Sequence, residues 1–367
     1  MLPKNDILQI GLTMWSLLGE SIHKTPKWLI FYRIFNGIIL GEVVLYTTLN
    51  LLHVEGVKFV DTIANISSAI HVFLKYFFFM YHKKNVCYLI NQLENFWDPP
   101  KSDLKLRKWT RKLYKVIRMA QKCFVLIVGV LIILYYLKPI FNHSSFPFDG
   151  YPITSSLFSE IFALFSLYHF FPIGLFCIMG YDCLYVSFCI HLIIQFRILN
   201  HRMKSIGVNK HQIIKDEIKM CVDYQNFLLK IFRIINETYS AMFMCQYFMT
   251  LGSACSQLYL LKISTNGVDS MKAILTLAVI FAQFAIYALP AEQIVTEVYN
   301  LAFALYSSSW QEIPLNHQKD VIFMIMKSQN QAYISIGGLF DMNIKTFVSV
   351  FRKGFSFYCL LDNLINK

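Results

Sequence analysis

The sequence predicts an all-α membrane protein with seven transmembrane helices, and three observations support that prediction. Hydrophobic residues make up 56% of the chain and charged residues only 15%, which is too little charge to cover a water-exposed surface. Apolar runs long enough to cross about 30 Å of hydrocarbon, which takes roughly 20 helical residues, recur along the chain. Lys and Arg are concentrated in alternate segments between these runs.

The apolar runs define the predicted membrane spans. In chain order they cover residues 29–52, 60–81, 123–141, 157–194, 234–261, 273–294 and 344–364. Four stretches within them contain no Asp, Glu, Lys or Arg, namely 123–137, 161–181, 238–261 and 273–291. The other spans carry interior charges, which are costly in hydrocarbon unless they face protein or water.

The basic residues predict the orientation of the spans. Segments 82–118 and 196–233 are rich in Lys and Arg, whereas the alternate segments contain few. By the positive-inside rule these basic segments are cytoplasmic, so residues 1–28 are expected inside and, after seven crossings, the C-terminus outside. This orientation is the reverse of that of G-protein-coupled receptors. It places the sequon Asn142-His143-Ser144 outside, so Asn142 is a candidate glycosylation site.

Several function classes are excluded by the same features. The net charge of +12 does not indicate nucleic-acid binding, because the basic residues flank spans and are explained by topology and anionic cytoplasmic lipid. The nine cysteines have no metal-binding or disulfide spacing. No HExxH motif, paired catalytic carboxylates or glycine-rich phosphate loop is present, so we expect neither an enzyme nor a cofactor. Residues 1–28 lack a cleavable signal pattern, so the first span is the expected signal anchor.

Apolar periodicity predicts helices that continue the spans into the cytoplasm. Apolar residues recur at helical spacing over 86–117, where Asp98-Pro99-Pro100 interrupts them, and again over 213–235. These extensions of the second to fifth spans are expected to form a cytoplasmic helical bundle. Residues 29–294 therefore comprise six spans and their extensions.

Residues 295–343 are predicted to be a cytoplasmic anchor region. They contain an amphipathic helix, a turn at Trp310, a helix stop at Pro314 and a second apolar helix over 319–328 that is too short to cross a membrane. The apolar faces must be buried against the cytoplasmic extensions or a partner subunit. The chain has no visible internal repeat, which argues against inverted-repeat transporters.

The last ~70 residues carry an ordered set of motifs. A Ser-rich turn precedes Trp310, the stretch MKSQNQAYISIGGLFDMNIKTFVSVF contains Gly337-Gly338 and Phe347, and the chain ends with the polar-aromatic-aliphatic helix FSFYCLLDNL. In these motifs and in its topology, the chain resembles the insect odorant receptors, seven-span subunits with a cytoplasmic N-terminus. Residues 196–233 are too short for the loop typical of the family's coreceptor, so the resemblance indicates a tuning subunit.

The resemblance implies a tetrameric, odorant-gated, non-selective cation channel that includes a shared coreceptor. Residues 344–367 would then form the pore-lining helix and a short extracellular end. Leu360 and Leu364 would form a hydrophobic gate that closes by dewetting, and Asn363 would be a polar residue at the pore mouth. The implied location is the cell membrane, specifically the olfactory neuron dendrite.

Three features of this helix leave other interpretations open. A leucine pair at i and i+4 is common in any helix, so Leu360 and Leu364 could be ordinary packing residues. The chain has Ser356-Phe357 where the family often has Thr or Ser followed by Tyr. Arg352 and Lys353 also place two cations in the helix, which conflicts with cation conduction unless only some of the four subunits carry them or they point sideways.

The family resemblance also implies where a small volatile apolar ligand binds. The site is expected in the outer half of the bundle, between the second, third, fourth and sixth spans, and to be lined by aromatic and aliphatic side chains. Tyr136 and Tyr168 could orient an ester or aldehyde oxygen. The candidate ligand-binding residues are Ile70, Phe73, Leu74, Phe77, Ile133, Tyr136, Leu137, Tyr168, Phe171, Pro172, Ile280, Phe281 and Phe284.

Ionisable residues in the second span should face protein or water. Lys75 and His71 are costly in lipid, and a structural partner such as a carboxylate or a carbonyl is expected, with a proton or ion relay as the alternative. Glu160 and Asp182 in the fourth span are the candidate partners. A gustatory receptor of the same superfamily and an unrelated membrane transporter are the alternative functions.

Overall fold

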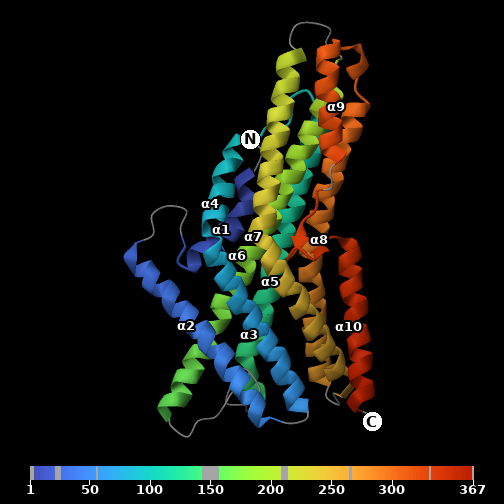
Figure 1. Cartoon of the computed structure of the whole chain (residues 1–367). Helices are drawn as coiled ribbons and strands as arrows, with labels where there is room; N and C mark the ends of the chain where they lie inside the picture. Colours follow the sequence, from blue (N-terminus) through green and yellow to red (C-terminus); the bar gives the residue numbers. More distant parts are fainter. Residues whose placement is uncertain are drawn as a thin grey trace.

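The computed structural model describes residues 4–20, 26–54, 57–142, 157–207, 214–263, 267–329 and 332–365. Most of these residues are helical (Figure 1). The helices are α1 (Leu8–Leu17), α2 (Lys27–Asn50), α3 (Val57–Tyr81), α4 (Lys83–Gln92), α5 (Leu104–Asn142), α6 (Leu157–Lys204), α7 (Ile214–Ile263), α8 (Gly267–Tyr306), α9 (Leu315–Gln329) and α10 (Ile344–Ile365). Short 3₁₀ turns cover Lys4–Ile7, Leu51–His53, Leu93–Asn95 and Trp310–Glu312, and strands β1 (Ser335–Ile336) and β2 (Phe340–Asp341) pair antiparallel.

Each predicted span lies mainly in one long helix: α2, α3, α5, α6, α7, α8 or α10. The four longest helices have 39, 48, 50 and 40 residues because a predicted extension and its span form one continuous helix. Among the described residues, four helical segments are long and apolar enough to cross a membrane, namely Lys27–His53, Thr62–Tyr81, Ile161–Lys204 and Ala273–Tyr306. The predicted span 238–261 of α7 has no charge but is rich in Ser, Thr and Gln, which lower its hydropathy.

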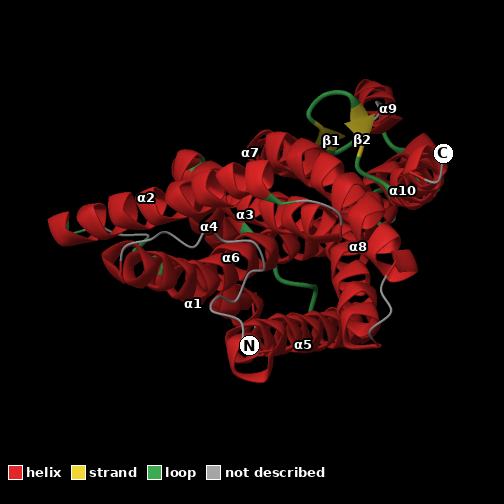
Figure 2. Cartoon of the chain, turned by 90° about the horizontal axis from the view of Figure 1, so that it is seen from below, coloured by secondary structure: helices red, strands yellow, loops and turns green. Residues whose placement is uncertain are grey.

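Helix α6 forms the centre of the bundle (Figure 2). It is apolar on all sides, as expected for a helix surrounded by protein. Between Ile173 and Leu199 most of its side chains are buried, and it packs against α1, α2, α3, α5, α7 and α8. The core of the molecule therefore follows α6 along its length.

The short helix α1 packs on α6 and α3, although its sequence does not qualify as a span. A Cβ at Gly11 would lie 2.8 Å from Leu184 Cγ, so the two helices approach closely there. The Trp15 ring stacks on Phe79 with centroids 5.6 Å apart. The segment predicted as a cytoplasmic N-terminal region thus contributes to the core.

The predicted anchor region continues α8 and then folds back. Helix α8 runs on to Tyr306, a 3₁₀ turn covers Trp310, and α9 begins directly after Pro314. The buried face of α9 packs against α8 and α7, and Gln225 Nε2 of α7 donates to Ser328 Oγ at 2.7 Å. The predicted second helix is therefore present but starts four residues earlier than the periodicity indicated.

A two-stranded hairpin connects α9 to α10 and docks on α7. Gly337 and Gly338 have φ angles of 58° and 77°, which glycine adopts without strain and which suit a tight hairpin turn. The Gly337 N–H donates to Ser240 O at 3.0 Å. A Cβ at Gly337 would clash with the Met244 side chain, so the glycine allows the turn to sit against α7.

Helix α10 lies at the edge of the bundle against α7 and α8 (Figures 1 and 2). Val350 is fully buried, and a Cβ at Gly354 would lie 3.2 Å from the Ala254 Cβ of α7. The other face carries exposed apolar side chains, including Phe355, Phe357 and Leu360. One face of α10 therefore packs within the chain and the other is uncovered.

Candidate functional site

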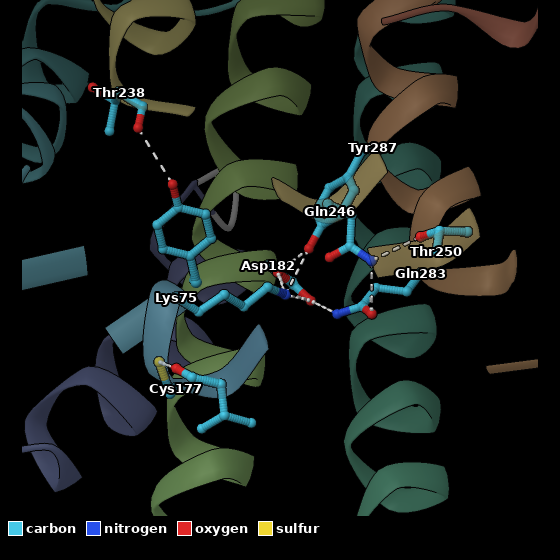
Figure 3. A network of polar contacts seen from close by, with 10 residues as sticks. Lys75, Cys177, Asp182, Thr238, Gln246, Thr250, Gln283 and Tyr287 are labelled. Carbon is cyan, nitrogen blue, oxygen red and sulfur yellow. Dashed lines mark hydrogen bonds and ion pairs between the residues drawn. The ribbon is translucent and has the colours of Figure 1, made fainter. Parts of the chain in front are cut away.

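A polar network joins α3, α6 and α8 in the interior (Figure 3). Lys75 Nζ lies 2.6 and 2.9 Å from the two carboxylate oxygens of Asp182 and 2.7 Å from the Tyr287 hydroxyl. The Tyr287 hydroxyl in turn donates to Asp182 Oδ1. The Lys75 and Asp182 side chains are only 0% and 1% exposed, so this ion pair is fully desolvated.

Two glutamines extend the network to α7. Gln283 Nε2 of α8 donates to Asp182 Oδ2 at 2.8 Å, and Gln246 Nε2 of α7 donates to Thr250 Oγ1 at 3.2 Å and, more weakly, to Gln283 Oε1 at 3.5 Å. The Gln246 amide also interacts with the ring of His71, one helical turn before Lys75. The network therefore links four helices.

Buried aromatic side chains surround the network on the α6 and α7 side. Tyr185 contacts Tyr239 and Tyr287 with ring centroids 5.0 and 5.6 Å apart, and its hydroxyl donates to the Tyr287 carbonyl oxygen at 3.1 Å. Phe243 lies 5.1 Å from both Tyr185 and Tyr287. These rings exclude water from the ion pair, which strengthens its electrostatic interaction.

The network answers the question that the sequence left open for Lys75. Asp182, one of the two candidate carboxylates, is its partner, so that prediction is confirmed. The side chain of Glu160, the other candidate, lies outside the described residues. No group of three His, Cys, Asp or Glu side chains within the described residues could hold a metal ion. All nine cysteines are described, and each is a free thiol.

Three of the predicted ligand residues on α5 and α6, namely Tyr136, Tyr168 and Phe171, form one cluster. The Tyr136 ring stacks on Tyr168 with centroids 5.1 Å apart and meets Phe171 edge-on at 5.3 Å. The Tyr136 hydroxyl donates to the Tyr168 carbonyl oxygen at 2.6 Å, so it already has an acceptor. Leu137 and Pro172, which directly follow Tyr136 and Phe171 in the sequence, are partly buried. Ile133 is 56% exposed.

The predicted residues on α3 differ in their exposure. Phe73 and Leu74 pack against the core, and Ile70 is partly buried. Phe77 is 54% exposed and stacks on Tyr81 at 6.2 Å, so it lies on the outside of this chain. Ile70, Phe73 and Leu74 thus belong to the interior side of α3.

The predicted residues on α8 face a different neighbour. Phe281 lies 4.8 Å from Phe351, and Phe284 stacks on Phe347 at 6.2 Å, both across the contact with α10. Ile280 is partly buried. Phe281 and Phe284 therefore lie between the bundle and the predicted pore helix, and the ligand-binding role of all thirteen residues stays a prediction.

The predicted gate lies at the end of α10. Leu360 is 58% exposed, so within this chain it is not a core residue. Asn363 and Leu364 are in the last turn of the helix, but their side chains lie outside the described residues, as does the side chain of Asn142 at the end of α5.

The two cations of α10 have different surroundings. Lys353 Nζ lies 2.9 Å from the Tyr247 hydroxyl and 5.7 and 5.5 Å from the ring centroids of Tyr247 and Phe340. Lys353 therefore points sideways onto α7 and the hairpin. Arg352 is exposed.

Three cavities lie in the predicted cytoplasmic half of the described chain, with volumes of about 510, 380 and 400 Å³. All three are lined by α7, and the last two also by α9, and none includes a predicted ligand residue. In the first, the Trp97 ring stacks on Tyr224 at 3.6 Å. Burial raises the pKa of the nearby Cys221 thiol to about 12, so this cysteine stays protonated at neutral pH. The second and third cavities therefore border the anchor region, whereas the first lies between α7 and residues 92–97.

Comparison with known proteins assigns the family. A family model described as 7tm Odorant receptor matches residues 55–354. The chain belongs to this family. Odorant receptor 30a of Drosophila melanogaster is 26% identical over 190 residues, which are 52% of this chain and 50% of that protein. Odorant receptor 10 of Aedes albopictus is 24% identical over 190 residues, which are 50% of each protein, so the chain spans about half the length of the curated relatives it matches.

The fold of an odorant receptor extends over nearly the whole chain. The structure of the insect olfactory receptor OR5 from Machilis hrabei covers 97% of both chains, with a TM-score of 0.82 and 15% sequence identity. A structure of that receptor in complex with eugenol covers 98% of this chain and 97% of that chain, with a TM-score of 0.80 and 16% identity. The predicted helical membrane fold is therefore confirmed. The relatives are odorant receptors, which also confirms the prediction that the chain is not an enzyme.

Proposed function

We propose that this chain is an odorant receptor subunit that binds a small, volatile, apolar molecule within its helical bundle and thereby opens a cation-conducting pore. The observation that carries the proposal is the family match over residues 55–354. The eugenol complex of the Machilis hrabei receptor supports a small aromatic volatile as the kind of ligand.

The interior of the bundle suits such a ligand. The buried Phe171 and the inner side of α3 supply non-directional apolar contacts. The Tyr136 ring, which meets Phe171, stacks on Tyr168, which is 41% exposed and borders the interior. Lys75, which belongs to the polar network, directly follows Leu74 on α3, so we place polar groups on one side of the site. The ligand would therefore contact aromatic rings over most of its surface and hydrogen-bonding groups at one end.

Two uncovered apolar surfaces favour assembly with other subunits. The outer face of α10 exposes Phe355, Phe357 and Leu360, and α9 exposes Phe323 and Met326. Exposed apolar patches are typical of surfaces that lipid or protein covers. We propose that α10 lines a pore shared with a coreceptor subunit in a tetramer, that the anchor region 295–343 packs between subunits, and that the channel resides in the cell membrane.

A calcium-flux screen in cells tests this function. Cells that express both the chain and an insect coreceptor should respond to at least one volatile, and cells that express either protein alone should not. A labelled surface fraction controls for trafficking. Normal surface expression with no response to any volatile, or responses restricted to non-volatile tastants, would contradict the proposal and favour the gustatory alternative.

A further inference from the structure

The third of the three cavities differs from the other two in its charge. It has a volume of about 400 Å³ and is lined by Arg233 of α7 and Lys327 of α9 but, among the described residues, by no Asp or Glu. The first cavity is lined by two aspartates and one lysine, and in the second Asp320 accompanies the lysines. Two cations without a carboxylate in a hollow of this size favour an anionic ligand.

Neither cation of the third cavity is neutralised within the part of the chain that the structure describes. Arg233 is exposed and makes no hydrogen bond or ion pair with another described residue. Lys327 is also exposed, and its Nζ contacts the neutral Asn226 Oδ1. Both charges are therefore available to a ligand, and a bond from either cation to a phosphate oxygen would be charge-assisted.

Polar groups of the segment that connects α9 to α10 complete the lining. Tyr333 and Ser335 each carry a hydroxyl, and Gly338 lines the cavity from the hairpin turn. A Cβ at Gly338 would have no atom within 4 Å, so the space beside it is open. The Gly338 N–H donates to no described residue, whereas the Gly337 N–H is bonded to Ser240 O. A free N–H group in a turn is a common contact of bound anions.

The third cavity lies at the predicted cytoplasmic border of the membrane. Arg233 directly precedes the predicted span 234–261, and in Figure 1 the hairpin lies below α9, at the level where α10 begins. Leu339 and Phe340, which follow Gly338, are 65% and 43% exposed and offer apolar surface beside the charged lining. A basic hollow with an apolar margin at this level fits the headgroup of an anionic lipid in the cytoplasmic leaflet.

We propose that the third cavity binds the headgroup of a phosphorylated inositol lipid. The ring phosphates accept hydrogen bonds from Arg233, Lys327 and the Gly338 N–H, and the acyl chains lie along Leu339 and Phe340. Because the hairpin connects the anchor region to α10, a bound headgroup holds this connection against α7. None of the predicted odorant residues is among those that line the cavity, so lipid binding is separate from the proposed odorant site.

Lipid titrations of the purified full chain test this site. The chain, in a nonionic detergent, is titrated with dioctanoyl phosphatidylinositol 4,5-bisphosphate, and native mass spectrometry measures the lipid-bound fraction. We expect the bisphosphate to bind about tenfold more tightly than dioctanoyl phosphatidylinositol, which lacks the ring phosphates that form charge-assisted bonds. Arg233→Gln and Lys327→Gln should each weaken binding of the bisphosphate about tenfold, and the double variant should remove the preference.

The matched control is Lys319→Gln, because Lys319 is an exposed lysine on the same helix as Lys327 and lines none of the three cavities. This variant should keep the wild-type affinity, and size-exclusion chromatography checks that each variant is folded. The proposal is wrong if phosphatidylinositol or phosphatidylserine with the same chains binds as tightly as the bisphosphate, or if Arg233→Gln and Lys327→Gln keep the wild-type affinity.

A second titration distinguishes the lipid from a soluble phosphate. Inositol 1,4,5-trisphosphate carries the same ring phosphates without acyl chains and should bind more weakly than the lipid. Equal affinity for the two would overturn the lipid as the ligand. Odorant responses play no part in these measurements, so failure of the lipid site leaves the proposed function standing, and failure of the odorant screen leaves the lipid site standing.

Discussion

Lys75 shows how a single residue can couple several helices of the bundle. A lone ammonium group in hydrocarbon is costly, but here it forms an ion pair with Asp182 and is bonded to Tyr287. The pair joins residues 107 positions apart in the sequence, and the tyrosine adds α8. These contacts hold α3, α6 and α8 in one register.

Removing one member of this pair should destabilise the protein strongly. Lys75→Met leaves the Asp182 carboxylate buried without its counter-ion, which typically costs about 3–5 kcal/mol. The double variant Lys75→Met/Asp182→Leu removes both charges and should recover most of the lost stability, because a buried ion pair and a well-packed apolar pair are often similar in stability. Both effects are measured as shifts in the unfolding temperature, which is obtained by heating the detergent-solubilised protein and quantifying the folded fraction by size-exclusion chromatography.

The control for this cycle is Lys108→Met, which removes an exposed lysine of α5 and should change the unfolding temperature little. If Lys75→Met were as stable as wild type, the ion pair would have no structural role. If the double variant were as unstable as the single one, the loss would come from the lysine's packing and not from an unpaired charge.

At the scale of elements, α10 is the helix whose two faces differ most. Its inner face packs on α7 and α8 through Val350 and Gly354, whereas Leu360 lies on the uncovered part. Lys353 lies against Tyr247 and Phe340, which removes one of the two cations from the uncovered face. This arrangement favours a pore-lining role for the outer face over a packing role.

Polar substitutions on the two faces of α10 should therefore have different effects. Leu360→Ser and Leu364→Ser should wet a hydrophobic constriction and raise the current without odorant by about twofold or more. Val350→Ser, on the buried face, should instead reduce surface expression because it places a hydroxyl in a packed apolar contact. Whole-cell recording with surface labelling distinguishes the two outcomes.

In the proposed heteromer the coreceptor would retain its own gate residues, so the change is also made at its matching position. If the doubly substituted channel reaches the surface normally and shows no added basal current, then Leu360 and Leu364 do not form the gate.

At the scale of the whole molecule, the two ends of the bundle have different composition. Figure 1 places α9 and the start of α7 at one end and the end of α10 at the other. The first end contains the segments rich in Lys and Arg, and the second contains the terminal helix. This distribution agrees with the predicted orientation, in which the basic end faces the cytoplasm.

Epitope tags test that orientation directly. A tag at residue 1 should be stained only after the cells are permeabilised, whereas a tag inserted between residues 143 and 156 should be stained on intact cells. Asn142→Gln should abolish any shift in mobility caused by glycosidase treatment. Staining of the residue 1 tag on intact cells would reverse the orientation.

The sequence by itself determined the helical membrane class, the order of the long helices and the turn and second helix of the anchor region. These features depend on local properties: the length of apolar runs, their periodicity, and breakers such as Pro314 and Gly337-Gly338. The family could also be identified from the ordered motifs of the last part of the chain. The sequence also named Glu160 and Asp182 as candidate carboxylate partners of Lys75, because a buried charge favours a counter-charge on a neighbouring span.

Only the tertiary structure decided which side chains meet. The rotation of each helix about its axis depends on its packing partners, and sequence spacing does not specify it when a helix is apolar on all sides, as α6 is. For this reason Asp182 as the partner of Lys75, the contact of Phe281 with α10, the docking of α1 on α6 and the contact of Gln246 with Gln283 could not be derived from the sequence. Each of these contacts joins segments far apart in the chain, whose approach is set by the packing of the whole bundle.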